Sequence, residues 1–411
     1  MFKWWVLLTL YLTQGLPHGF FGQALPTLLR QQGMSLEAIG LMSLVSLPWV
    51  LKFLWAPLLD HYQPLKRITG GRIDGHIRKT WIISANAIAA LVLIVVAVTP
   101  LEVWINQTAV GFAALLLLLT AFVVTQDIAT DALAVENISA QQRGLGNSLQ
   151  VAGYRIGMVI GGGALLALFA HLGWQGTLWT LAAMMLLGLI PLWFWQPKPV
   201  VVNKEPIVQH WLGFFRLQGA GAWLLLLITY KVGDAFGTNM IRPHLVDLGM
   251  SLSEFATLLG VWGTLAGLVG AILGGLLLKF LPRITALMIF LSLEAIAIGS
   301  YSLLTALDWP LVYSLIILEH IAGGMATVAL FTVMMDRCRE ASAGSDYALQ
   351  SCLVVLSTLI ASSLAGFSAA NFGYATHYLL AAVLCLLALV LVIINSKNMT
   401  MNGNNNLITT K

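Results

Sequence analysis

The chain has 411 residues, of which 59% are hydrophobic and only 9% are charged. This composition excludes a soluble globular domain and indicates a protein that crosses a membrane many times. The net charge of +4 does not indicate a nucleic-acid partner, because the basic residues are distributed by loop and do not gather on one face.

The apolar residues are arranged in stretches of membrane-spanning length. A transmembrane helix needs about 20 mostly apolar residues, and the sequence offers twelve such stretches separated by short polar joints. They lie at residues 4–28, 36–59, 80–99, 109–134, 148–170, 176–195, 222–241, 253–280, 284–306, 310–335, 347–369 and 374–395. The predicted fold class is therefore an all-α integral membrane protein with twelve transmembrane helices.

The long joint after the sixth span divides the chain into two halves. We expect an N-terminal six-helix half over residues 1–195, a cytoplasmic linker over 196–221 and a C-terminal six-helix half over 222–395. Most lysines and arginines outside the spans fall on one side, which the positive-inside rule assigns to the cytoplasm. Both termini are then cytoplasmic, and the asparagine-rich tail over 396–411 is expected to be a disordered cytoplasmic tail.

The first span carries polar and glycine residues that a simple anchor does not need. Gln14 and His18 are four residues apart, so they share one helix face. Gly15 and Gly19 permit the close approach of a substrate or of another helix. We favour a span that lines a transport pathway; the alternative is that His18 only bonds a neighbouring helix and that the glycines only serve packing.

A short internal repeat indicates an architecture of two related halves. The tetrapeptide Gly-Met-Ser-Leu at 33–36 returns at 249–252, each time after a polar-interrupted span. The serine is placed to cap the helix that follows. Such repetition is typical of transporters that hold substrate near the bilayer midplane, between two halves.

Asp127 and Asp131 are the first functional signal in the sequence. They lie four residues apart in an apolar segment, so both carboxylates project from one helix face. A carboxylate at mid-membrane depth costs about 2.5 to 3.5 kcal/mol, so the pair needs a water-filled path or a partner such as Lys52 in the second span. The alternative is that the span ends near Thr125 and that the two acids cap a cytoplasmic helix end.

Other ionisable residues lie within spans of both halves. Arg155 is expected to pair with a carboxylate or to bind an anionic substrate, and Gly157 and Gly161 beside it form a tight helix-packing pair. Lys231 and Asp234 share the seventh span, and at their i, i+3 spacing the alternative to a site is that they neutralise each other.

The tenth span holds Glu319 and His320 near its middle. A carboxylic acid in a low-dielectric environment beside a histidine is a reasonable proton site. This span occupies the place in the second half that the span with Asp127 and Asp131 occupies in the first.

Several stretches together resemble the AmpG-like permeases of the major facilitator superfamily. They are QGLP at 14–17, KFLWAPLLD at 52–60, QDIATDA at 126–132, RG at 143–144, GYRIG at 153–157 and GWQ at 173–175. The resemblance implies a proton-driven importer of the bacterial inner membrane that works by alternating access. It also implies that Asp60, Lys66 and Arg67 form a cytoplasmic gate that latches the two halves, although simple anchoring by positive charge explains the two basic residues as well.

Two branches of this group compete for the substrate. Muropeptide permeases of the AmpG type are usually longer than this chain. The compact length and the run at 19–40 look more like the RhtX/FptX siderophore permeases. Import of a siderophore or ferric siderophore is therefore the expectation, and symport of anhydromuropeptide with a proton is the alternative.

These observations assign expected roles to the polar residues within the spans. Substrate contact is assigned to Gln14, His18, Arg155, Lys231, Asn239 and His320. Proton coupling, or the charge network that governs it, is assigned to Lys52, Asp127, Asp131, Asp234 and Glu319. The expected partners are a small-molecule substrate, protons and the lipid bilayer, with the protein acting as a monomer.

Other classes of protein fit the sequence less well. A membrane-embedded enzyme is a remote alternative, because the histidines are scattered and no HExxH motif is present. A passive channel does not explain the two-half architecture, and an ATP-driven pump would need a P-loop. No metal or cofactor is expected, since the cysteines at 338, 352 and 385 lack metal-ligand spacing.

Overall fold

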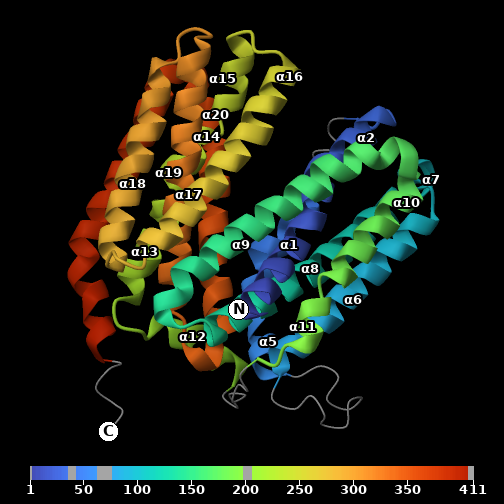
Figure 1. The fold of residues 1–411 in the computed structure, drawn as a ribbon, viewed down its shortest axis with the longest axis horizontal. Coiled ribbons are helices and arrows are strands. Elements are labelled where there is room, and N and C mark those ends of the chain that lie inside the picture. Colours follow the sequence, from blue (N-terminus) through green and yellow to red (C-terminus); the bar gives the residue numbers. More distant parts are fainter. Residues whose placement is uncertain (1, 36–42, 63–75, 198–205, 406–411) are drawn as a thin grey trace. The chain divides into compact units, whose positions relative to one another are not determined.

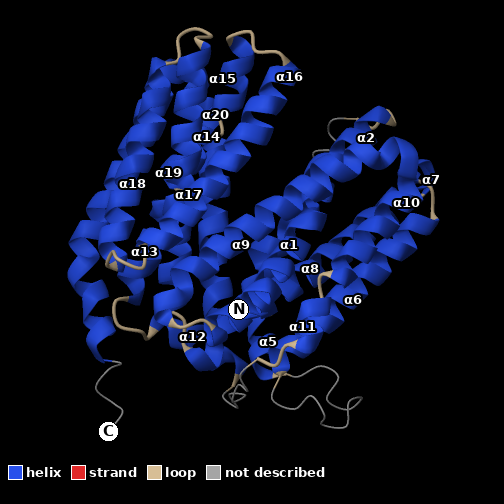
Figure 2. Ribbon diagram, in the orientation of Figure 1, coloured by secondary structure: helices blue, strands red, loops and turns tan. Residues whose placement is uncertain are grey.

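The computed structural model describes residues 2–35, 43–62, 76–197 and 206–405, and within them the regular secondary structure is entirely helical (Figure 2). The described residues contain seven helical stretches long and apolar enough to cross a membrane. They are Ile77–Val98, Ala109–Asn137, Ala140–Phe194, Thr257–Leu277, Arg283–Leu303, Trp309–Asp336 and Glu340–Ser396. The predicted all-α integral membrane fold is confirmed.

The number of spans stays a prediction. Two of the seven stretches, Ala140–Phe194 and Glu340–Ser396, have 55 and 57 residues and break at glycines with positive φ, Gly173 and Gly373. A helix rises about 1.5 Å per residue, so each of these stretches is long enough to cross a bilayer twice. The first and seventh predicted spans, and the described part of the second from residue 43 onwards, consist of several shorter helical segments.

The chain divides into two compact units that differ from the two halves of the sequence. Unit 1 comprises Met1–Ser139, Leu149–Trp211 and Cys338–Cys352, and unit 2 comprises Ala140–Ser148, Leu212–Arg337 and Leu353–Lys411. A short segment of each sequence half therefore belongs to the opposite unit. Nothing in the sequence predicts this exchange.

In unit 1 the long helices pack side by side, α8 against α6 and α6 against α10 (Figure 1). Apolar side chains from α1, α6, α8 and α10 fill the core between them. The elements of this unit are α1 (Phe2–Gly19), η1 (Phe20–Ala24), α2 (Leu25–Gln31), η2 (Ser43–Ser46), α4 (Leu47–Leu51), η3 (Lys52–Leu54), α5 (Ala56–His61), α6 (Ile77–Val98), α7 (Leu101–Gln107), α8 (Ala109–Asn137), most of α9 (Arg143–Met158), η5 (Val159–Ala164), α10 (Leu165–Leu187), α11 (Ile190–Phe194), and η8 (Glu340–Ser342) with the start of α20 (Ala343–Asn405).

In unit 2, α19 packs against both α17 and α18 (Figure 1). The elements are η4 (Ala140–Gln142) with the start of α9, then α13 (Ala220–Tyr230), α14 (Val232–Thr238), α15 (Ile241–Asp247), α16 (Leu252–Phe255), η6 (Ala256–Gly263), α17 (Thr264–Leu277), α18 (Arg283–Ser300), η7 (Tyr301–Leu303), α19 (Trp309–Asp336) and the rest of α20. α12 (Ile207–Phe215) lies across the boundary between the units. α20 continues to Asn405, so residues 396–405 are helical where the sequence predicts a disordered tail, and residues 406–411 lie outside the described residues.

The repeated tetrapeptide has the same backbone in both copies at its glycine. Gly33 has a φ of +80° and Gly249 a φ of +95°, a region that side chains other than glycine rarely adopt. In the second copy, the Ser251 backbone N–H donates to the Glu254 carboxylate over 2.9 Å, and the Glu254 N–H points back to the Ser251 hydroxyl over 3.4 Å. This reciprocal arrangement is a capping box that starts α16. The helix after Ser35 lies outside the described residues.

Glycines bring α1 into direct backbone contact with α9 and η5. A Cβ at Gly15 would collide with the Tyr154 carbonyl oxygen, and a Cβ at Gly157 would collide with the Leu12 carbonyl oxygen. A side chain at Gly161 would meet the backbone of Leu16 in the same way. The packing role of Gly157 and Gly161 is confirmed. Gly15 and Gly19 of α1 also lie against the backbone of α9 and η5.

Candidate functional site

A buried ion pair joins α8 to the broken second span of unit 1. Pro57 lacks the N–H that would continue a regular helix, and the chain here changes from α4 to η3 and then to α5, with Lys52 at the first junction. The Lys52 Nζ lies 2.7 Å from Oδ2 of Asp127, and these residues are 4% and 5% exposed. Lys52 thus has the partner that its buried charge requires.

Asp131 lies one helical turn beyond Asp127, on the same face of α8. Its Oδ1 accepts hydrogen bonds from the Tyr11 hydroxyl over 3.2 Å and from Nε2 of Gln150 over 3.1 Å. Both donors are neutral, and Lys52 reaches this pair of carboxylates through its contact with Asp127. α8 continues to Asn137, and the alternative that these two acids cap a helix end near Thr125 is therefore wrong.

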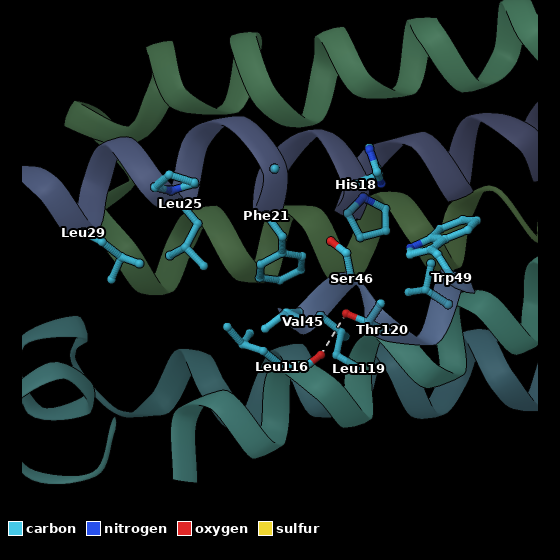
Figure 3. Close-up of a pocket in the computed structure, with 14 residues that line it drawn as sticks. His18, Phe21, Leu25, Leu29, Val45, Ser46, Trp49, Leu116, Leu119 and Thr120 are labelled. Atoms are coloured by element: carbon cyan, nitrogen blue, oxygen red, sulfur yellow. Dashed lines mark hydrogen bonds between the residues drawn. The ribbon is translucent and has the colours of Figure 1, made fainter. Parts of the chain in front are cut away.

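His18, one of the two predicted pathway residues of α1, lines a cavity of about 290 Å³ within unit 1 (Figure 3). His18 is exposed towards this cavity, and its ring lies 5.8 Å from that of Trp49 and 5.5 Å from that of Tyr154 between centroids. The walls are mainly apolar, with polar groups from His18, Ser46, Trp49 and Thr120. This cavity can hold an apolar or ring-shaped part of a solute.

Gln14 and Arg155 lie on the two helices that the glycines hold together. Gln14 is 1% exposed, and its Nε2 has no hydrogen-bond partner among the described residues. A buried amide without a partner costs free energy unless a ligand or water satisfies it. Arg155 follows Tyr154 on α9 and is half-buried.

Asp60 is the centre of a second buried cluster in unit 1. Nη2 of Arg78 donates to Asp60 over 2.6 Å, while Nε of Arg78 donates to Glu136 over 2.8 Å. The start of α20 supplies the other donors: the backbone N–H groups of Gly344 and Ser345, at 3.1 and 2.8 Å, and the Ser345 hydroxyl. Asp60 therefore joins α5 to a segment that belongs to the second half of the sequence. Lys66 and Arg67, the other predicted gate residues, lie outside the described residues.

Unit 2 has its own buried charge cluster, on α14 and α18. Nζ of Lys231 lies 2.6 Å from both Asp234 and Glu294. The alternative in which Lys231 and Asp234 neutralise each other is thus partly correct, but a third residue shares the charge. Glu294 is completely buried; the sequence shows it as an isolated acid in an apolar span and gives no sign of its partner.

Glu319 and His320 lie next to this cluster, on α19. Glu319 accepts a hydrogen bond from the Tyr301 hydroxyl over 3.1 Å and lies 2.7 Å from Nδ1 of His320. Asn239, the remaining predicted contact residue, donates from Nδ2 to the Ser362 carbonyl over 2.8 Å. The structure therefore brings Lys231, Asp234 and Glu319 into one region of unit 2.

Two arginines bind the acid at the end of α19 in unit 2, which the sequence does not reveal. Asp336, the last residue of α19, accepts from Arg143 and from Arg283, each over 2.8 Å. Unit 1 has a similar arrangement of an arginine at a helix start and an acid near a helix end. Arg283 is the first residue of α18, and Arg78 lies in the first turn of α6. Asp336 is the last residue of α19, and Glu136 lies near the end of α8. Arg78, Arg143 and Arg283 look like ordinary loop charges in the sequence, and only the helix ends beside them could have indicated this role.

Comparisons with known proteins place this arrangement among transporters. A model of the Major Facilitator Superfamily matches residues 7–354 and, in a second match, residues 234–398. The anhydromuropeptide permease of Escherichia coli K12 is 31% identical over 401 residues, covering 95% of this chain and 79% of the permease. A putative transporter AmpG 4 of Rickettsia conorii is 28% identical, over 94% of this chain and 95% of that protein.

Solved structures share the fold at low sequence identity. A bacterial homologue of the iron transporter ferroportin in an outward-facing state aligns with a TM-score of 0.72 and 16% identity, over 97% of this chain and 100% of that one. The Escherichia coli fucose:proton symporter aligns with a TM-score of 0.69 and 13% identity, over 96% and 98% of the two chains.

Proposed function

Since this chain belongs to the major facilitator superfamily, we propose that it imports anhydromuropeptides together with protons across the bacterial cytoplasmic membrane. Family membership makes it a multi-pass membrane transporter of small molecules and not an enzyme. The similarity to an anhydromuropeptide permease along nearly the whole chain is the observation that carries the choice of substrate.

The siderophore substrate expected from the sequence is not supported. That expectation depends on the run at 19–40 and on the compact length of the chain, taken as a feature that separates it from AmpG-type permeases. The putative transporter AmpG 4 of Rickettsia conorii aligns over nearly its entire length with this chain. Compact length is therefore compatible with the AmpG group, and the alternative given with the siderophore expectation becomes the main proposal.

The proposed substrate fits the polar groups of both units. A muropeptide contains sugar rings and a peptide with carboxylate groups, so it needs basic residues, amides and flat surfaces. Gln14, His18 and Arg155 in unit 1, and Lys231, Asn239 and His320 in unit 2, supply these groups, and the cavity beside His18 offers aromatic surface to a ring. We propose that substrate binds these residues during alternating access.

The remaining proposals concern the gate and the setting in the membrane. We propose that Asp60, with Lys66 and Arg67, acts at the cytoplasmic gate, and that Lys52, Asp127, Asp131, Asp234 and Glu319 form the charge network that couples protons to transport. The protein is further proposed to act as a monomer, with both termini in the cytoplasm.

Uptake by a strain that lacks its own permeases tests the substrate. Cells that produce this protein are expected to accumulate labelled anhydromuropeptide, and a protonophore is expected to abolish the accumulation. Labelled ferric siderophore serves as the matched comparison, because it is also large, polar and acidic. Accumulation of the siderophore alone would refute the muropeptide proposal.

Replacing Asp131 by asparagine tests the coupling network of unit 1. The new amide side chain has nearly the size of the carboxylate and can still accept from Tyr11, so we expect normal amounts of folded protein in the membrane. Accumulation of anhydromuropeptide is expected to fall to the background of empty cells, because the titratable group is lost. The variant Asp308→Asn, at an exposed position, is the control, and unchanged uptake by Asp131→Asn would remove this residue from the mechanism.

A further inference from the structure

Three carboxyl groups of unit 2 surround one glycine of α19. A Cβ at Gly323 would lie 3.2 Å from Oε1 of Glu319, 3.5 Å from Oε1 of Glu294 and 3.9 Å from Oδ1 of Asp234. α14, α18 and α19 thus each direct one acid towards the same small volume. The absence of a side chain at Gly323 leaves space for all three.

Within the part of the chain that the structure describes, the positive charge in contact with these three acids does not balance them. Lys231 is the ammonium group that contacts two of the three carboxylates. His320 contacts the third, and even in its protonated form it leaves one negative charge without compensation. Because an unpaired buried charge costs several kcal/mol, the cluster favours a proton on one of its carboxyl groups.

Hydrogen bonding distinguishes the three carboxyl groups. Glu319 has two neighbours that stabilise its charge, the Tyr301 hydroxyl and His320. The Asp234 side chain is 19% exposed, so water can solvate it. Glu294 has a side chain that is 0% exposed, and its Oε2 has no hydrogen-bond partner among the described residues. Glu294 is therefore the carboxyl group for which ionisation is most costly.

The other titratable groups that the described residues place near Glu294 bring no compensating positive charge. Tyr230 from α13 and Cys385 from α20 both lie within electrostatic range of its carboxylate. Both are uncharged at neutral pH. Lys231 is consequently the cation that decides whether Glu294 is ionised.

We infer that Glu294 binds the proton that this transporter couples to its substrate. The incoming proton adds to the carboxylate of Glu294 and ends its ion pair with Lys231, which stays paired with Asp234. Departure of the proton restores the three-residue arrangement. The inference rests on the proposed proton symport and assigns the proton to α18, with Glu319 as a neighbouring charge and not as the carrier.

Infrared spectroscopy of the full-length protein in lipid nanodiscs tests this site without any substrate. At neutral pH the wild type is expected to show the C=O stretching band of a buried, protonated carboxyl group. Glu294→Gln is expected to reduce the area of this band, whereas the exposed control Glu102→Gln is expected to leave it at the wild-type value. A band of wild-type area in folded Glu294→Gln protein would overturn the inference.

A second variant covers the case in which Glu294→Gln does not fold. Lys231→Gln removes the cation that competes with the proton, so the carboxyl band at neutral pH is expected to grow. An unchanged band would contradict the assignment. In both experiments the result is independent of whether anhydromuropeptide is the substrate.

Transport in proteoliposomes then separates coupling from binding. Glu294→Gln is expected to exchange labelled anhydromuropeptide across the membrane in counterflow, but to lose accumulation driven by a proton gradient. Accumulation at the wild-type level would refute a coupling role. Failure of the wild type to transport anhydromuropeptide at all would refute the proposed substrate, and the infrared band would still decide the proton site.

Discussion

Lys52→Met is expected to lower the free energy of unfolding of this protein by about 3 to 5 kcal/mol, the range for breaking one side of a buried ion pair. The substitution leaves the carboxylate of Asp127 buried, with Asp131 one turn away on the same face of α8. Two neighbouring acids without a cation repel each other in a medium of low dielectric. Thermal unfolding of the purified protein in detergent measures the effect.

Two further variants test whether charge is the cause. Lys52→Met combined with Asp127→Asn removes both partners, and it is expected to regain most of the lost stability because neither charge of the ion pair remains buried without its partner. Lys279→Met, at an exposed position, is expected to unfold at nearly the wild-type temperature. If the double variant is no more stable than Lys52→Met, the loss comes from packing of the lysine side chain and not from the ion pair.

Asp60→Ala is the second substitution for which we expect a large effect. It removes the acceptor of Arg78, of the Ser345 hydroxyl and of two backbone N–H groups at the start of α20. The Ser345 hydroxyl and the two backbone N–H groups lose this acceptor, while Arg78 keeps Glu136 as its acidic partner, and the loss is expected to cost about 3 to 5 kcal/mol. The start of α20 is then expected to separate from α5 much more often.

Cysteine labelling measures this separation. In a background without the native cysteines, Ala343→Cys places a thiol at a fully buried position beside the Asp60 cluster. We expect a maleimide to label this thiol several times faster in Asp60→Ala than in the otherwise identical protein with Asp60. Equal labelling rates would mean that Asp60 does not hold the start of α20, and the proposed gate would lose its main support.

Local sequence pattern predicts much of unit 1 because the relevant contacts follow from helix geometry. The four-residue spacing of Asp127 and Asp131 places both on one face of α8, and the cost of burying Lys52 requires an acidic partner. The glycines of α1 and α9 indicate close approach for the same local reason, the absence of a Cβ. Here the helix period and the cost of burial are sufficient to identify the interacting groups.

Contacts across long sequence distances could not be predicted in this way. Asp60 ends a helix and looks like an acid in a basic loop, while its partners Gly344 and Ser345 are small residues without a distinctive signal. The sequence predicts a cytoplasmic surface charge at Arg78, but this residue is 2% exposed and paired with two acids. A charge at a helix end has the same local sequence whether it faces water or another helix. Whether such a charge is exposed or buried therefore depends on the tertiary fold.

The partner of Glu294 in unit 2 could not be predicted from local sequence pattern either. A single acid in an apolar span predicts a partner, but several basic residues of the second half could supply it. The contact with Lys231 depends on how α14 packs against α18, which periodicity does not determine. The residue that we propose as the proton carrier was therefore visible in the sequence, although its role was not.

The exchange of segments between the units determines when, during synthesis, unit 1 can finish folding. The first half of the sequence contains Asp60, but the N–H group of Gly344, which Asp60 binds, is synthesised 284 residues later. At a ribosomal rate of about 5 to 20 residues per second, this interval lasts roughly 15 to 60 s. During that time Arg78 is the strongest partner available to Asp60, and the side of α5 that the start of α20 covers stays uncovered. A ribosome stalled before residue 338 should therefore carry a unit 1 that is inserted in the membrane but lacks the segment that completes it.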